Sequence, residues 1–69
     1  MKQFKDVLRA KRKALNLTQY ELADIIGTSQ NIVTKWETGR FFPGFLYLAD
    51  LADFFQCSVD ELMGREQKP

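Results

Sequence analysis

The chain contains no histidine and only one cysteine among its 69 residues, and it has no long apolar run. Without histidine, the commonest metal ligand and the usual general base are missing. A lone cysteine, Cys57, cannot form an internal disulfide, which favours a reducing compartment such as the cytoplasm. The apolar runs fall far short of the roughly 20 residues that span a bilayer, and no signal-peptide pattern is present. These absences argue against a zinc, secreted or membrane protein, and we expect no metal or cofactor.

The length and composition predict one small globular domain. Apolar residues make up 45% of the chain and charged residues 28%, as in soluble folded proteins. We expect a domain over residues 1–64 and a short polar tail over residues 65–69. Residues 1–40 carry eight basic and four acidic side chains, whereas residues 41–69 carry two and five. This asymmetry suits a polyanion-binding face, although a solvated first helix explains the charges equally simply.

Helical periodicity and capping residues predict the first two helices. Apolar residues recur at helical spacing over residues 3–14, and Asn16 suits the left-handed position that ends a helix. Thr18 followed by Glu21 has the pattern of a capping box at the start of a second helix. Gly27 is expected to end that helix, because it lacks a Cβ.

Three further helices complete an all-α fold. Ser29 is the expected N-cap of a third helix, which ends near Thr38-Gly39. Pro43 cannot continue a preceding helix, and a fourth helix is expected over residues 45–55. Ser58 is the expected N-cap of a short fifth helix, where it begins a second capping-box pattern. No segment alternates apolar and polar residues for long enough to predict a strand. The expected apolar packing residues are Phe4, Val7, Leu8, Leu15, Leu22, Ala23, Ile25, Ile26, Val33, Trp36, Phe45, Leu48, Leu51, Ala52, Phe55 and Cys57.

The second and third helices have the spacing of a helix-turn-helix, in which the second helix enters the DNA major groove. Many small helical proteins contain a similar corner. If Val33 and Trp36 face the core, the side chains turned outward are polar and none is acidic: Gln30, Asn31, Thr34 and Lys35. Amides can pair with adenine, and lysine can reach guanine or a phosphate. An ordinary solvated helix face would look the same. For Ile32, packing on the helix flank is favoured over contact with a thymine methyl.

Several segments together resemble the Cro/repressor helix-turn-helix family. They are Leu17–Ala23, Gly27–Gln30, Trp36–Arg40 with Pro43, Leu48–Ala52 and Ser58–Leu62. The resemblance covers roughly residues 4–64. It implies a compact five-helix, lambda-repressor-like domain. It also implies dimers that bind operator DNA as an inverted repeat and usually repress transcription in bacteria or phages.

The resemblance also implies roles for single residues. Gln19 matches a position that touches a phosphate and can meet a base. The recognition-helix contact positions are matched by Ser29, Gln30, Asn31, Thr34 and Lys35. A phosphate-binding loop is matched by Thr38, Gly39 and Arg40. Arg12 and Glu37 match an internal salt bridge, although from the residues alone they could be two unrelated surface charges.

Four residues depart from the family pattern. Lys11 stands where relatives often carry an apolar residue, so we expect the first helix to pack less fully or to turn slightly. Ile32 stands where a small polar residue is common. Asn16 and Gln56 stand where glycine is usual. Asparagine tolerates a left-handed backbone well and glutamine less so, which makes a left-handed turn less favourable before the fifth helix than after the first.

The sequence leaves two questions about partners open. Phe41, Phe42 and Tyr47 are candidates for a homodimer contact, with additional core packing as the alternative. The expected function is a sequence-specific transcriptional regulator that binds double-stranded DNA. The competing functions are a protein-interaction module on the same fold and an antitoxin that regulates its own operon. An enzyme is disfavoured because no nucleophile motif or phosphate-binding glycine loop is present.

Overall fold

The computed structural model describes residues 3–65 of the chain. These residues form five helices and no strand, which confirms the all-α prediction. The helices are α1 (Phe4–Ala14), α2 (Gln19–Ile26), α3 (Gln30–Glu37), α4 (Phe45–Phe55) and α5 (Val59–Leu62). The predicted tail beyond Arg65 lies outside the described residues.

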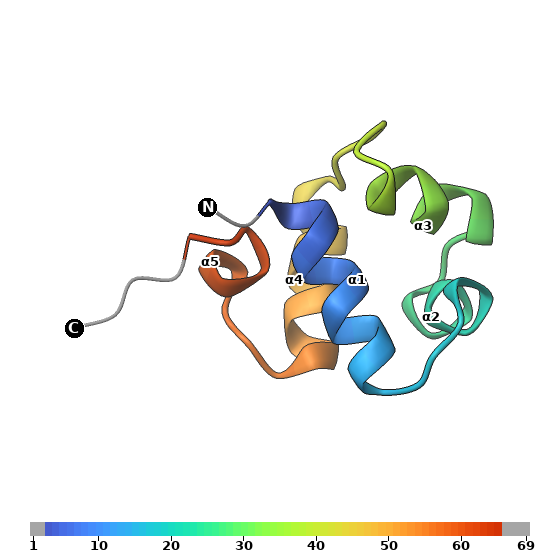
Figure 1. Ribbon diagram of the computed structural model, residues 1–69, viewed down its shortest axis with the longest axis horizontal. Coiled ribbons are helices and arrows are strands. Elements are labelled where there is room, and N and C mark those ends of the chain that lie inside the picture. Colours follow the sequence, from blue (N-terminus) through green and yellow to red (C-terminus); the bar gives the residue numbers. More distant parts are fainter. Residues whose placement is uncertain (1–2, 66–69) are drawn as a thin grey trace.

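The helices are arranged with α2 and α3 at one end of the molecule and α5 at the other (Figure 1). Between them, α1 packs against α3 and α5, while α4 packs against α2 and α5. The helix-turn-helix unit is therefore supported from behind by the two longest helices.

Each helix contributes one apolar residue that has no exposed surface: Leu8, Leu22, Val33, Leu51 and Leu62. Burying a side chain of this size contributes about 1.5–3 kcal/mol. The large aromatic residue of this core is Trp36, which is 2% exposed and contacts Tyr47 edge-on at a centroid distance of 5.3 Å. Because all five helices meet in this one cluster, the position of α3 depends on the whole fold.

The predicted signals at both ends of α2 are confirmed. The Thr18 hydroxyl accepts a hydrogen bond from the Glu21 backbone N–H at 3.0 Å, and the Glu21 carboxylate accepts one from the Thr18 N–H at 2.8 Å. Asn16 takes the left-handed conformation before this box, with φ of 59°. Gly27 takes the same region after the helix, with φ of 89°.

The α4–α5 junction differs from the prediction in two respects. Gln56 adopts the left-handed conformation that usually falls to glycine, with φ of 54°. Only half of the second capping box forms: Ser58 Oγ accepts from the Glu61 N–H at 3.0 Å. The Glu61 carboxylate instead accepts from Lys11 Nζ at 2.6 Å. Lys11 thus joins α1 to α5, where looser packing of α1 was expected.

Four apolar residues are less buried than predicted. Leu15 is 51% exposed, because it follows the last residue of α1. Phe45 is 76% exposed, because it occupies the first position of α4 and lies beyond the edge of the core. Ile25 is 49% exposed on the outer side of α2. Cys57 is only half-buried against the core.

Candidate nucleic-acid interface

The corner between α2 and α3 is short and rigidly bonded. The backbone N–H groups of Gly27 and Thr28 both donate to the Ala23 carbonyl, at 2.8 and 2.9 Å. Ser29 then caps α3, because its Oγ accepts from the Ile32 N–H at 3.2 Å. The start of α3 is therefore held in a defined direction relative to α2.

The outward face of α3 is polar, as its periodicity predicts. Gln30 and Asn31 in the first turn are exposed, whereas Val33 and Trp36 are buried. One turn further on, Thr34 and Lys35 are half-buried; these four polar side chains are brought to one face. Ile32 is half-buried against the core, which confirms the expected flank packing.

A hydrogen-bonded chain links this face to the interior. The Thr34 hydroxyl donates to Gln19 Oε1 at 2.6 Å, and Gln19 Nε2 donates to Glu37 Oε1 at 3.0 Å. Two residues expected to contact DNA are thus bonded to each other between α2 and α3. The bonds leave the Thr34 oxygen able to accept and Gln19 with a second amide N–H to donate.

Beneath these hydrogen bonds lies a buried ion pair between Arg12 and Glu37. Arg12 Nε donates to one carboxylate oxygen at 2.7 Å and Nη2 to the other at 2.9 Å, while Nη1 donates to the Leu17 carbonyl at 2.6 Å. The Glu37 side chain has no exposed surface, and that of Arg12 is 10% exposed. The two residues are therefore not separate surface charges.

The surroundings of Glu37 favour its ionised form. Burial alone would raise its pKa, but the hydrogen bonds from Arg12 and Gln19, with the charges of Arg12 and Arg9, leave the pKa below its usual value. The hydrogen bond to Glu37 likewise raises the pKa of Arg12, against an opposing effect of burial. The pair thus stays charged at neutral pH.

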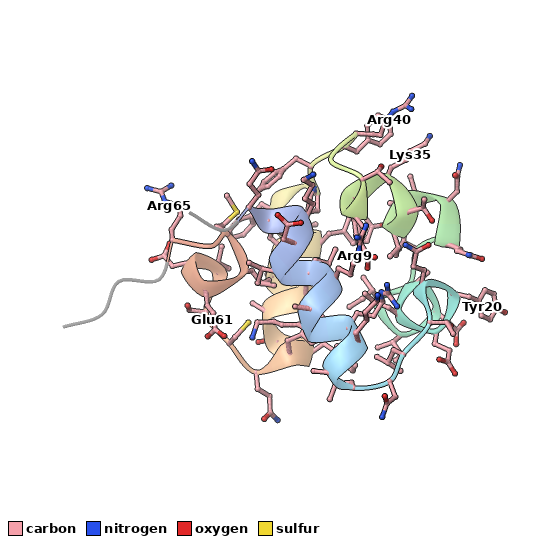
Figure 2. The ribbon with its side chains drawn as sticks, in the orientation of Figure 1. Arg9, Tyr20, Lys35, Arg40, Glu61 and Arg65 are labelled. Carbon is pink, nitrogen blue, oxygen red and sulfur yellow. The ribbon has the colours of Figure 1, made fainter. Side chains whose placement is uncertain are left out.

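Arg9 is part of this network, although the sequence analysis did not select it. Its Nη2 donates to the Glu37 backbone carbonyl at 3.1 Å, and its Nε lies 3.6 Å from Glu37 Oε1. In Figure 2 the side chain lies between α1 and α3. Its position three residues before Arg12, on the same helix face, is the sequence signal that could have identified it.

The loop after α3 is bonded back to Lys35. The Lys35 carbonyl accepts from the N–H of Arg40 at 2.9 Å and of Phe41 at 3.2 Å, and from the Thr38 hydroxyl at 3.3 Å. Gly39 makes the turn with φ of 80°, and a Cβ there would lie 3.3 Å from the side chain of Lys5. Arg40 is exposed, and it projects at the same edge of the molecule as Lys35 in Figure 2.

The three aromatic residues proposed for a dimer contact have different surroundings. Phe41 is 52% exposed, and Phe42 is 54% exposed with an edge-on contact to Phe4 at 5.1 Å. Tyr47 is half-buried against Trp36 and therefore lies at the margin of the core. The most exposed apolar side chains of this region belong instead to Phe45 and Leu46, at 76% and 77%. Leu46 was not among the residues predicted from the sequence.

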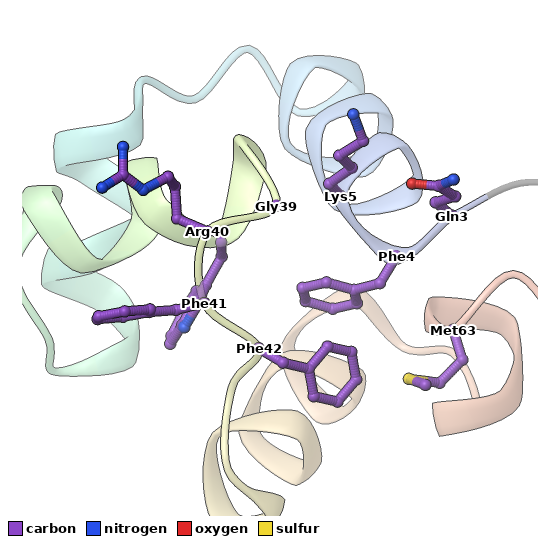
Figure 3. A pocket seen from close by; sticks show the side chains of 9 residues that line it. Gln3, Phe4, Lys5, Gly39, Arg40, Phe41, Phe42 and Met63 are labelled. Carbon is purple, nitrogen blue, oxygen red and sulfur yellow. The ribbon is translucent and has the colours of Figure 1, made fainter.

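Phe41 and Phe42 leave the loop in opposite directions (Figure 3). Phe42 points toward Phe4 and Met63, where the loop and α1 enclose an open groove of about 480 Å³. Four of its nine lining residues are aromatic, and the basic residues Lys5 and Arg40 also line it.

The described residues contain neither a membrane-spanning helix nor a cluster of metal-binding side chains. Over residues 3–65, no helix combines the length and the apolar composition required to cross a membrane. In the same range, no three side chains of the metal-binding types Cys, Asp and Glu form a cluster that could hold a metal ion.

Comparison with known proteins assigns this arrangement to a family. A sequence profile described as Helix-turn-helix matches residues 8–62, from the middle of α1 to the end of α5. The chain belongs to the helix-turn-helix family. The resemblance to Cro/repressor proteins is confirmed, since phage repressors are among its relatives and its structural matches.

This helix-turn-helix chain matches part of two longer curated relatives. It is 43% identical over 61 residues to the cryptic phage CTXphi transcriptional repressor RstR of Vibrio cholerae, covering 88% of this chain and 54% of RstR. It is 34% identical over 65 residues to the HTH-type transcriptional activator BcrR of Enterococcus faecalis, covering 94% of this chain and 32% of BcrR. The chain thus spans between about a third and about half of these relatives.

The helix-turn-helix fold also matches solved structures. The c2 repressor of Salmonella phage P22, in complex with a synthetic operator, superposes with a TM-score of 0.88 at 29% identity; the match covers 96% of this chain and all of that one. A transcriptional regulator from Listeria innocua superposes with a TM-score of 0.87 at 28% identity, over 97% of this chain and 63% of the regulator. These matches confirm the predicted five-helix, lambda-repressor-like fold.

Proposed function

We propose that this chain is a sequence-specific DNA-binding transcriptional regulator of the repressor type, which reads one operator half-site through α3. The observation that carries the proposal is that Gln30 and Asn31, in the first turn of α3, are both exposed. The helix itself is fixed in place by the turn after α2 and by its buried residues in the core. Side-chain amides can make two hydrogen bonds to adenine in the major groove. The match to a repressor bound to operator DNA supports DNA binding by this chain. In helix-turn-helix proteins the second helix of the motif, here α3, lies in the major groove.

The residues on this face divide into two roles. Gln30, Asn31, Thr34 and Lys35 are the proposed base-contacting set. The residues proposed to contact the DNA backbone, or the backbone and a base together, are Gln19, Ser29, Thr38, Gly39 and Arg40. Exposed Arg40 suits a phosphate because guanidinium groups form strong bidentate bonds to it. Residues 1–64 are proposed to form the DNA-binding domain, acting in the bacterial cytoplasm or, for a phage protein, in that of the host.

Salt dependence of binding tests the DNA-binding part of the proposal. Affinity of the chain for a duplex of random sequence is measured across a salt series. Neutralising phosphates releases counterions, so affinity should fall steeply as salt rises, by close to one power of the salt concentration per phosphate contacted. No binding even at low salt would contradict the proposal and favour the protein-interaction module. Capture of a partner protein by the chain, together with salt-sensitive DNA binding, would favour the autoregulating antitoxin.

We further propose that the chain forms a homodimer on DNA through its most exposed apolar residues. Phe45 and Leu46 each leave about three-quarters of the side chain exposed, and Phe42 lies in the loop just before them. Apolar patches of this kind are typical of interaction sites. Sedimentation with a duplex that carries an inverted repeat should show two chains per duplex. The double substitution Phe45→Ser and Leu46→Ser should give one chain per duplex without loss of helicity; two chains per duplex for this variant would contradict the proposed contact.

A further inference from the structure

Lys35 and Phe41 make a close contact that connects the recognition helix to the loop after it. Lys35 Nζ lies over the Phe41 ring, 4.7 Å from its centroid. An ammonium group within about 6 Å of an aromatic face is attracted to it by the ring quadrupole. The ring is 52% exposed and is absent from the apolar core cluster, so burial does not account for its position.

The backbone holds the two residues together independently of their side chains. The Lys35 carbonyl accepts hydrogen bonds from the N–H groups of both Arg40 and Phe41. The Phe41 ring is therefore tied to the residue whose ammonium it faces. Lys35 in turn lies four residues after Asn31, on the outward face of α3.

From this geometry we infer that Phe41 is a positioning residue for Lys35, and not part of a dimer contact. The ring restricts the long lysine side chain before DNA arrives, and it holds the ammonium at the loop end of the outward face. A side chain that is already restricted loses less conformational freedom on binding. The inference rests on the proposed DNA-binding function and adds a residue that acts through Lys35.

A double-mutant cycle on DNA affinity tests this inference. The cycle combines Phe41→Leu, which removes the ring and keeps an apolar side chain, with Lys35→Met, which removes the charge. Binding is measured on a random-sequence duplex at low salt and on duplexes selected from a random library. Phe41→Leu should weaken binding about two- to fivefold in the wild-type background, the range of an exposed cation–π contact. In the Lys35→Met background it should have no effect.

Phe42→Leu is the matched control, because Phe42 is the neighbouring residue and is equally exposed but faces Phe4. Its effect on affinity should be the same with and without Lys35→Met. In the free protein, NMR should show the Lys35 side-chain methylene protons shifted upfield by the Phe41 ring. That shift should vanish in Phe41→Leu and persist in Phe42→Leu.

The outcomes separate this inference from the proposed function. If the wild type binds no duplex, the proposed function fails and the inference fails with it. If the wild type binds but the effects of Phe41→Leu and Lys35→Met are additive, only the inference is overturned. Tighter binding by Phe41→Leu would also overturn it, because the ring would then withdraw Lys35 from DNA.

Discussion

Replacing Glu37 with glutamine should strongly destabilise the fold, because it removes the charge at the centre of the buried network. The substitution keeps the size of the side chain. It also leaves one oxygen to accept from Arg12 and places an NH₂ group where the second guanidinium bond was made. Arg12, whose side chain is 10% exposed, then keeps a charge with no compensating carboxylate.

The magnitude follows from the burial of both partners. Breaking a buried pair by removing one partner costs about 3–5 kcal/mol. The Leu17 carbonyl still accepts from Arg12, so we expect a value near the lower limit, about 3 kcal/mol. For a domain of this size, each kcal/mol lowers the melting temperature by about 4–8 °C. The variant should therefore melt at least about 10 °C below the wild type.

The same residue should contribute to acid unfolding. The pKa of Glu37 in the folded chain lies below its usual value of 4.5. A carboxyl group with a lowered folded-state pKa stabilises the fold above its unfolded-state pKa, and this stability is lost as the pH falls through the folded-state pKa. The wild type should therefore lose stability below about pH 4.5, and Glu37→Gln should lack this part of the pH dependence.

Urea unfolding, followed by circular dichroism at neutral and acid pH, measures both effects. Glu61→Gln is the control, because Glu61 also pairs with a cation of α1 but at a partly exposed site, with side-chain exposures of 23% and 34%. It should cost about 0.5 kcal/mol. Equal losses for the two variants would refute the reasoning, since burial would then have no influence on the strength of the pair.

Four other predictions concern the backbone geometry and the proposed interface. Gly39→Ala should destabilise the fold by about 1–2 kcal/mol in urea unfolding, because the φ of Gly39 is 80°. Gly44→Ala is the control, since its φ is −68° and nothing lies within 4 Å of the added Cβ; it should change the stability by less than about 0.5 kcal/mol. Equal effects of the two substitutions would contradict this prediction. Gln56→Gly should stabilise the chain by about 0.5–1 kcal/mol by relieving φ of 54°, and a loss in the same assay would count against it. Gln30→Ala should cost about 1–3 kcal/mol of binding and relax preference at one base position. Arg40→Ala should weaken binding to all duplexes and reduce the salt slope by about one; a changed base preference would contradict its role.

Capping residues and apolar spacing predicted the helices well, because the start and end of a helix depend on residues that are close in the sequence. The capping box at Thr18 and the left-handed Asn16 involve contacts within a few residues, so the sequence pattern contains all the necessary information. Val33 and Trp36 were assigned correctly to the core, and their spacing turned the polar residues of α3 outward.

The predictions failed where a residue distant in the sequence, or a position at the end of a helix, determined the contacts of a side chain. Glu61 satisfied the capping pattern, but its carboxylate bonds to Lys11, which is 50 residues away in the sequence. Phe45 has the right spacing for the buried face of α4, yet the first position of that helix lies outside the core. The contact between Lys35 and Phe41 depends on a loop conformation that no periodicity describes.

Selection of bound duplexes from a random DNA library tests the central claim most directly. The chain should enrich an inverted repeat whose half-sites lie about one helical turn apart, near 34 Å from centre to centre. Asn31→Ala should lose the preference at one position of each half-site and keep the spacing. If the chain binds DNA but enriches no sequence at low or physiological salt, α3 does not read bases, and the claim that this is a sequence-specific regulator is wrong.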